Sequence, residues 1–225
     1  MGHQRSSQVR KKVLIGGAVS EHLYTYINPP NERHLARVCQ ILADDGVIIY
    51  PTGINWAFAC DAASKKAIDK INRIKGGDDK HAFSLICSDI SMASTVSNID
   101  HGLYRVLKRL WPGHYTVLLK RNRSLPKQIK DKRQIVGVRI PDSPLALAVV
   151  EKFGKPLVTS SLPPKKDGTF YHLGYEVFED FASRGIDILL DLGEHLPGLE
   201  STIVDYSEGS PVIVREGAGD VSLIA

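Results

Sequence analysis

Lysine, arginine and hydroxyl side chains stand at the predicted ends of several strands and helices in this chain. Thr52 follows the apolar run 47–50, and Ser160 lies at the end of the strand predicted over 157–159. Ligands of α/β proteins bind where strands end, and cations and hydroxyl groups there bind phosphate or carboxylate groups. The candidates for such an anion-binding site are Thr52, Lys75, Arg139, Ser160, Ser161 and Arg215.

Each candidate also has a structural interpretation, which the residues alone leave open. Ser160 and Ser161 can begin a turn by bonding to their own backbone, and Lys75 can complete the dipole of the helix before it. Arg139 and Arg215 each end an apolar run, in Val-Arg-Ile-Pro and Val-Arg-Glu-Gly. An arginine in that position pairs either with a ligand anion or with one of the 25 acidic side chains.

A strongly basic segment over 120–133 is a separate candidate, for nucleic-acid binding. Asp131 is the only acidic residue in this segment. Such a run of cations can contact the phosphates of RNA or DNA. It can also be a solvated loop, because no aromatic residue in it would stack on bases. The residues predicted to contact nucleic acid are Lys120, Arg121, Arg123, Lys127 and Lys130.

Composition and motifs exclude several classes of protein. The 225 residues are 43% hydrophobic and 24% charged with a net charge of +4, as in an ordinary globular protein. No Walker phosphate loop, dinucleotide-binding glycine motif or zinc-binding spacing occurs, and three scattered cysteines suit a reducing compartment. No apolar run reaches the roughly 20 residues of a membrane span. We expect a cytoplasmic protein whose residues 1–12 form a flexible basic tail.

Strands and helices are predicted to alternate along the chain, but unevenly. Asn31 and Ser64 are N-cap residues that predict helices over 31–44 and 64–75. This order predicts one α/β domain over 13–225, a twisted mixed sheet flanked by helices rather than a parallel doubly wound fold. Further helices are predicted over 89–95, 101–110, 144–153 and 174–183, and strands over 23–27, 47–50, 83–87, 115–119, 135–140, 157–159, 186–190, 202–204 and 212–215.

Seven sequence blocks, taken in their order along the chain, resemble the YrdC-like domain family, the threonylcarbamoyl-AMP synthases. The resemblance covers about residues 25–220. The segment His81-Ala82-Phe83-Ser84-Leu85 is similar to the YciO branch of this family. The seven blocks are residues 50–52, 74–75, 111–116, 138–141, 156–160, 201–205 and 214–217.

The resemblance implies a twisted, mostly open α/β sheet with a concave basic cleft. It implies a reaction in which threonine, bicarbonate and ATP, with Mg²⁺, form threonylcarbamoyl-AMP and pyrophosphate. Such a site must hold a carboxylate and a triphosphate together, which fixed cations and hydroxyl donors do by electrostatic preorganisation. Members of the family are also described as binding double-stranded RNA or tRNA. An RNA-binding module without synthase activity is therefore the alternative function.

The resemblance also assigns roles to individual residues. Lys75 and Ser160 are implied as catalytic residues, and both would contact the nucleotide. The implied substrate-binding residues are Thr52, His81 and Arg139, and the implied nucleotide-binding residues are Lys75, Ser160, Ser201, Thr202 and Arg215.

Two residues depart from the pattern of the family it resembles. The family carries a Lys-x-Arg pair and a Ser-x-Asn pair, but Gly77 stands in place of the arginine and Leu162 in place of the asparagine. One planar cation and one amide are thereby lost from the implied phosphate site. Because a hydrogen bond to a charged group contributes about 1.5–3 kcal/mol, the resemblance admits an activity that is weak or altered in its substrate.

Overall fold

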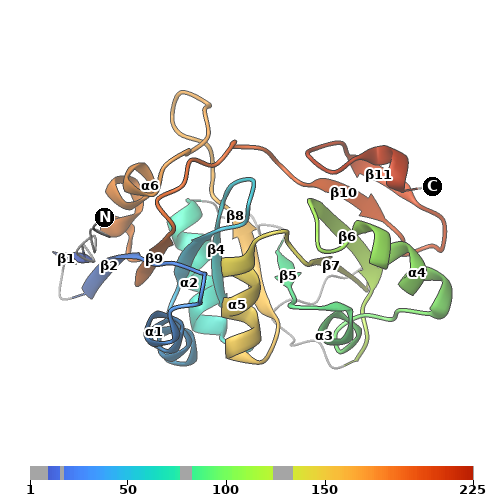
Figure 1. Cartoon of the computed structure of the whole chain (residues 1–225), viewed down its shortest axis with the longest axis horizontal. Helices are drawn as coiled ribbons and strands as arrows, with labels where there is room; N and C mark the ends of the chain where they lie inside the picture. Colours follow the sequence, from blue (N-terminus) through green and yellow to red (C-terminus); the bar gives the residue numbers. More distant parts are fainter. Residues whose placement is uncertain (1–9, 16–17, 77–82, 124–133, 225) are drawn as a thin grey trace, which may run out of the picture.

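An eleven-stranded mixed sheet forms the framework of the protein (Figure 1). The computed structural model describes residues 10–15, 18–76, 83–123 and 134–224. The strand order is β1-β2-β9-β3-β4-β8-β5-β7-β6-β10-β11. The strands are β1 (Arg10–Ile15), β2 (Ala18–Tyr24), β3 (Ile48–Pro51), β4 (Trp56–Asp61), β5 (Ser84–Ile86), β6 (Tyr115–Lys120), β7 (Ile135–Arg139), β8 (Leu157–Ser161), β9 (Ile188–Asp191), β10 (Thr202–Asp205) and β11 (Val212–Arg215).

The described residues form six α-helices beside this sheet, and side chains cap most of them. The predicted caps are confirmed, because Asn31 Oδ1 accepts from His34 N and Ser64 Oγ accepts from Ala67 N. These bonds satisfy backbone donors that a helix start leaves unpaired. The helices are α1 (Glu32–Ala43), α2 (Lys65–Lys75), α3 (Ile90–Ser94), α4 (His101–Leu110), α5 (Pro144–Phe153) and α6 (Gly174–Phe181), the last followed by a 3₁₀ turn over Ala182–Arg184.

The core lies on both faces of the sheet, because alternate residues of the central strands point to opposite sides. In β4, Ala57 and Ala59 join one apolar cluster, whereas Trp56 and Phe58 join the other. Helices α1 and α5 cover the first cluster, and α2, α4 and α6 supply side chains to the second. The predicted fold class, a single α/β domain with a mixed sheet flanked by helices, is confirmed.

The sequence prediction missed two strands, β1 and β4, and it placed a third strand, β2, at the wrong residues. β1 begins at Arg10, inside the segment predicted as a tail, and β2 runs over Ala18–Tyr24 rather than 23–27. Among the described strands β1 pairs with β2 alone, and the sequence of an edge strand rich in lysine and arginine resembles that of a solvated tail. β4 is a continuous buried run without the alternation that marks a half-buried strand.

Twist and loop contacts bring distant strand ends together. The loop that leaves β7 touches the end of β3, where Ser143 Oγ donates to Pro51 O at 3.1 Å. Gly53 has a positive φ of 88°, and a Cβ at this position would lie 2.6 Å from Asp142 O. The segment between β9 and β10 crosses the upper side of the molecule (Figure 1) and bonds to Ile54 O through the N–H groups of Gly198 and Leu199.

Glu176 fastens the loop before α6. Its carboxylate accepts from Lys165 Nζ at 2.8 Å and from the N–H groups of His172 and Leu173 at 3.0 Å. Burial opposes ionisation, but these hydrogen bonds outweigh it and lower the pKa of Glu176 to about 2. The ionised carboxylate therefore stabilises the folded protein.

We expect Glu176→Gln to lower the free energy of unfolding at pH 7 by about 1 kcal/mol, or the Tm by about 2–4 °C. Because the folded pKa is depressed, the contribution of Glu176 is complete above its unfolded pKa near 4.5. It is lost as the pH falls from there toward 2. Thermal melts of both proteins between pH 7 and pH 3 test this. A Tm difference that stays constant to pH 3 would contradict it.

Candidate functional site

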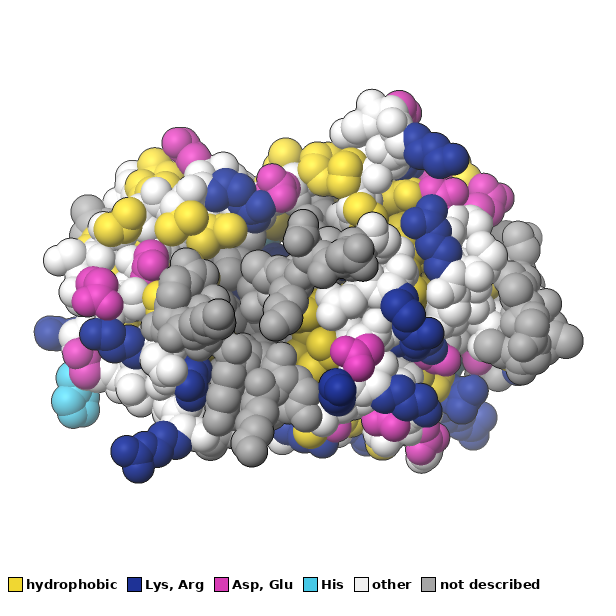
Figure 2. Space-filling model, turned by 180° about the vertical axis from the view of Figure 1, so that it is seen from behind, with side chains coloured by type: hydrophobic (Ala, Val, Ile, Leu, Met, Phe, Trp, Pro, Cys, Tyr) yellow, Lys and Arg dark blue, Asp and Glu magenta, His cyan; other side chains and the backbone are white. Residues whose placement is uncertain are grey.

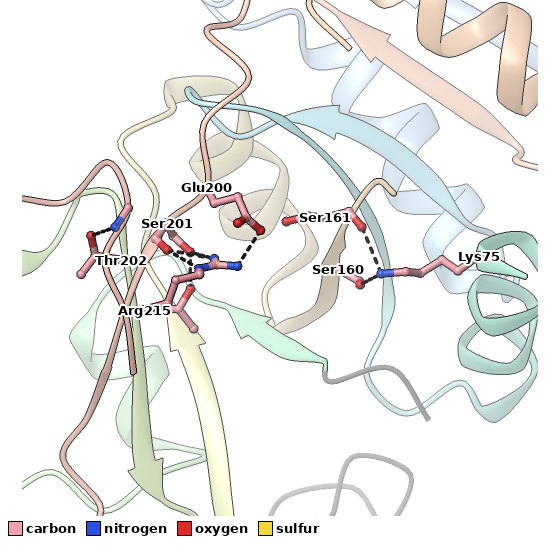
Figure 3. A network of polar contacts seen from close by, with 9 residues as sticks. Lys75, Ser160, Ser161, Glu200, Ser201, Thr202 and Arg215 are labelled. Atoms are coloured by element: carbon pink, nitrogen blue, oxygen red, sulfur yellow. Dashed lines mark hydrogen bonds and ion pairs between the residues drawn. The ribbon is translucent and has the colours of Figure 1, made fainter. Parts of the chain in front are cut away.

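Lys75 and Ser160 are in direct contact, although 85 positions separate them in the sequence. Lys75 is the last residue of α2, and its Nζ donates to Ser160 Oγ at 2.6 Å and to Ser161 O at 3.1 Å (Figure 3). Gly76 closes the helix in the left-handed conformation, so the lysine extends from a capped helix end to β8. Burial lowers the pKa of Lys75. Among the described residues no carboxylate pairs with it.

Arg215 holds Ser201 at the junction of β10 and β11. Its Nε and Nη2 donate to Ser201 O at 3.1 and 2.9 Å, and Nη1 forms an ion pair with Glu200 at 2.6 Å (Figure 3). Ser201 Oγ, which is buried, also lies 2.9 Å from Thr116 Oγ1. Arg215 is thus already paired within the protein, as the structural interpretation of this arginine predicts.

Arg139 is a charged side chain in a buried position. It is only 6% exposed at the end of β7, and its Nε and Nη2 find no hydrogen-bond partner among the described residues. Burial lowers the pKa of Arg139, with a further lowering by Arg215 and an opposing effect of Tyr50. A buried guanidinium without a partner is costly. Of the two interpretations of Arg139, pairing with a ligand anion is therefore favoured over an internal salt bridge.

Thr52 uses its hydroxyl inside its own loop. It is 1% exposed, and its Oγ1 lies 2.9 Å from Asn55 O and 2.8 Å from Asn55 Oδ1. These contacts stabilise the tight turn between β3 and β4. In this conformation the Thr52 hydroxyl stabilises the β3–β4 loop. This loop contacts both the segment after β7 and the segment between β9 and β10.

Thr202 also has a fully used hydroxyl. Its Oγ1 donates to Gly219 O at 2.8 Å and accepts from the N–H groups of Gly217 and Gly219 at 2.9 and 3.0 Å. The side chain is completely buried. One donor and two acceptor positions are all that a threonine hydroxyl offers, so this geometry leaves none for a phosphate.

The predicted nucleic-acid residues divide between described and undescribed parts of the chain. Lys120 lines a hollow of about 820 Å³ between α4 and the ends of β6 and β10, and its Nζ lies 3.8 Å from Glu208. Arg121 Nη1 donates to Asn122 O at 3.5 Å, and Arg123 follows in a turn. On the face seen in Figure 2, Lys and Arg side chains are interspersed with Asp and Glu side chains. Lys127, Lys130, His81 and Gly77 lie outside the described residues.

The sequence prediction missed several residues that the fold adds to this region. Tyr50 raises the pKa of Arg139 through its electrostatic interaction with the guanidinium, and its OH lies 2.9 Å from Thr159 Oγ1. Trp56 Nε1 and His114 Nδ1 are buried without a hydrogen-bond partner among the described residues. Tyr50, His114 and Thr116 all occur in the sequence blocks quoted above. These blocks could have identified them, but nothing in their spacing indicates a role.

The described residues give little indication of a metal-binding site or of a reactive cysteine. No group of three or more His, Cys, Asp or Glu side chains is placed there to hold a metal ion. The three cysteines are free thiols, and burial, with Asp89, raises the pKa of Cys87 to about 12. Cys60 is fully buried, which agrees with an unreactive thiol. Nor does the described part of the chain contain a helix with the length and apolar character of a membrane span.

Comparison with known proteins gives a match over most of the chain. A model of the Sua5_yciO_yrdC family, described as telomere recombination, matches residues 40–217. The "Uncharacterized protein YciO" of Escherichia coli (strain K12) is 33% identical over 204 residues, which cover 90% of this chain and 98% of that protein. The crystal structure of E. coli YciO matches with a TM-score of 0.81 at 31% identity and covers 92% of this chain and all of that one.

More distant similarity extends to enzymes of known name. The threonylcarbamoyl-AMP synthase of Pyrococcus abyssi is 29% identical over 174 residues, which cover 76% of this chain and 50% of that protein. The crystal structure of P. abyssi Sua5 complexed with L-threonine matches with a TM-score of 0.75 at 24% identity. It covers 84% of this chain and 55% of that one, and at this identity it shows a shared fold.

Proposed function

Because this chain belongs to the Sua5/YciO/YrdC family, we propose that it binds ATP and threonine and catalyses the threonylcarbamoyl-AMP synthase reaction. Threonine, bicarbonate and ATP would form threonylcarbamoyl-AMP, pyrophosphate and water. Relatedness to these synthases at the family level supports this function. So does a relative of the same fold that binds L-threonine. The chain also matches YciO over nearly its whole length, and YciO is named as uncharacterized. The substrate of this branch is therefore what the experiment has to test.

The observation that carries the proposal is the buried guanidinium of Arg139, whose Nε and Nη2 have no hydrogen-bond partner among the described residues. Arg215 lies near enough to lower the pKa of Arg139. Glu200 already pairs with Arg215, whereas Nε and Nη2 of Arg139 have no such partner among the described residues, so a ligand anion would stabilise the Arg139 charge. Both the carboxylate of threonine and the phosphates of ATP are such anions.

The other residues of the site support the same use. In the proposed complex Lys75 turns from Ser160 and Ser161 toward the phosphates, and Ser160 Oγ is then free to donate to a phosphate oxygen. Arg215 holds Ser201 and the β10 start in place. Mg²⁺ would be bound mainly through ATP phosphates, since the described residues offer no cluster of carboxylates for it.

The test is pyrophosphate release by the purified protein, with threonine, bicarbonate or ATP omitted in turn. We expect release only when all three are present. Lys75→Ala should lower the rate at least tenfold because a buried cation facing the phosphates is lost. Lys152→Ala is the matched control, since Lys152 is also a lysine of a helix end but pairs with Glu32 on the surface. Release that is absent, or that needs neither threonine nor bicarbonate, would contradict the proposal.

A further inference from the structure

The contact between Lys75 and Ser160 has the geometry of an activated serine. A distance of 2.6 Å between Nζ and Oγ is within the range over which a base takes the proton of a nucleophile. Ser160, near the end of β8, is 7% exposed. A lysine that acts as base for serine is a known variant of the serine nucleophile arrangement.

In the structure Lys75 Nζ is the donor to Ser160 Oγ, so Lys75 must first lose a proton before it can act as a base. A neutral amine has two N–H donors and one lone pair. Ser161 O accepts one hydrogen at 3.1 Å, and the lone pair can then accept the hydrogen of Ser160 Oγ. Burial favours this form, because it lowers the pKa of the ammonium group.

Apolar side chains lie on the same face of the sheet as Ser160. Ser160 stands opposite Phe58 in the β4–β8 ladder. Leu162 follows two positions later on the same side, and its N–H donates to Trp56 O at 3.1 Å. Leu162 is 6% exposed and belongs to the same apolar cluster as Phe58 and Trp56. A leucine at this position excludes water and provides no amide that would occupy the serine.

An unused N–H donor lies on the same face. Trp56 is 2% exposed, and its Nε1 has no partner among the described residues. The ladder places Trp56 diagonally across from Ser160, at a separation that an aromatic side chain spans. A small cavity of about 10 Å³ adjoins Trp56 and Leu162, which is about the space of one oxygen atom. A buried N–H donor without a partner on this face of the sheet is suited to a carbonyl oxygen that gains negative charge.

We propose that Ser160, with Lys75 as its base, is a nucleophile for activated carbonyl groups, namely acyl or carbamoyl groups with a phosphate leaving group. Ser160 Oγ bonds to the carbonyl carbon, its proton passes to Lys75 Nζ, and the bond to the leaving group breaks. Lys75 returns the proton to the leaving phosphate. Water then hydrolyses the serine ester in the same way, so no oxidant or reductant is needed. This inference rests on the proposed function only for its natural substrate, a carbamoyl adenylate formed in the same site.

The experiment uses two probes of reactive serines, a fluorophosphonate and p-nitrophenyl acetate, on the full chain. Intact mass and peptide mapping should show one adduct on Ser160, with a labelling rate that rises with pH as Lys75 loses its proton. Ser160→Ala should remove this adduct. Lys75→Arg should slow labelling at least tenfold, because arginine keeps the charge but cannot act as base. Ser210→Ala is the control and should label like the wild type, since Ser210 is an exposed serine between β10 and β11.

Labelling of other serines only, no labelling at all, or an unchanged rate in Lys75→Arg would overturn the proposal. Mapping of the adduct on the wild-type protein decides the site even if Ser160→Ala fails to fold. Neither probe involves ATP or threonine. A protein that labels on Ser160 but releases no pyrophosphate would refute the synthase proposal alone, and the reverse result would refute the nucleophile alone.

Discussion

Arg139→Met is expected to raise the thermal stability of this protein while it abolishes binding of anionic ligands. Methionine has a similar length and no charge. Replacing a buried ionic group by an apolar side chain of similar volume is commonly neutral or stabilising by about 1–4 kcal/mol. The gain should lie toward the upper part of this range, because Nε and Nη2 have no partners in the described part of the chain that the substitution would leave unpaired. For a chain of this size a gain of about 3 kcal/mol corresponds to a rise in Tm of about 6–12 °C.

The same substitution removes the charge that the proposed ligand would neutralise. Two hydrogen bonds from a buried guanidinium to an anion contribute about 1.5–3 kcal/mol each. Their loss should weaken binding at least 100-fold. Thermal melts with and without ATP or pyrophosphate measure both effects at once, since a bound ligand raises the Tm of the wild type by mass action. Arg105→Met, on the exposed side of α4, is the control and should leave the ligand-induced shift unchanged.

A structural role for Arg139 gives the opposite pattern. If Arg139 formed an internal salt bridge, its removal would leave a buried carboxylate unpaired and lower the Tm, with ligand binding reduced only as far as folding is. A stabilised protein with an intact ligand shift would also contradict our interpretation. Stability and binding therefore have to change in opposite directions.

The sequence predicted those features of the fold that depend on contacts between residues close together in the chain. The ends of α1 and α2 follow from Asn31, Ser64 and Gly76, whose caps bond to residues only three or four positions away. β1 and β4 could not be recognised in the same way. β1 depends on pairing with β2, and β4 is a central strand whose burial comes from α2 on one face and α1 on the other.

The sequence identified residues of the candidate site, but it did not predict which of them contact one another. Lys75 and Ser160 were both identified, yet their bond spans 85 positions and exists only because β8 pairs with β4 beside α2. For Thr52 and Thr202 the sequence pattern indicates a hydroxyl at a strand end but not its partners. Those partners are groups of the chain itself, Asn55 in one case and Gly217 and Gly219 in the other. A motif therefore shows which groups are available, and the fold decides which of them remain free.

Thr202→Val is expected to destabilise the protein strongly, because the Thr202 hydroxyl holds the segment after β11. Valine has nearly the shape of threonine but leaves Gly219 O and the N–H groups of Gly217 and Gly219 without partners. Each unsatisfied buried group costs about 1–3 kcal/mol. Partial access of water limits the sum, so we expect a loss of about 3–5 kcal/mol and a fall in Tm of about 10 °C.

The segment over 217–219 is closely packed, so its backbone cannot move to form replacement hydrogen bonds. A Cβ on Gly217 would lie 2.4 Å from Glu200 O, and one on Gly219 would lie 2.5 Å from the ring of Tyr115. The backbone therefore cannot shift toward the strand to find new partners. Because Arg215 directly precedes this segment and bonds to Ser201, loosening it should also displace the Arg215 guanidinium.

Thr202→Ser provides the matched control, since it keeps the hydroxyl and removes only a methyl group. It should retain most of the stability that Thr202→Val loses, with a cost of about 1 kcal/mol for the lost methyl. Urea unfolding of the three proteins measures these differences. A contrary result is also defined: if the hydroxyl bound a phosphate, Thr202→Val would keep its stability and lose only the ligand-induced rise in Tm. The order of the two variants therefore separates a hydroxyl that supports the site from one that contacts the nucleotide.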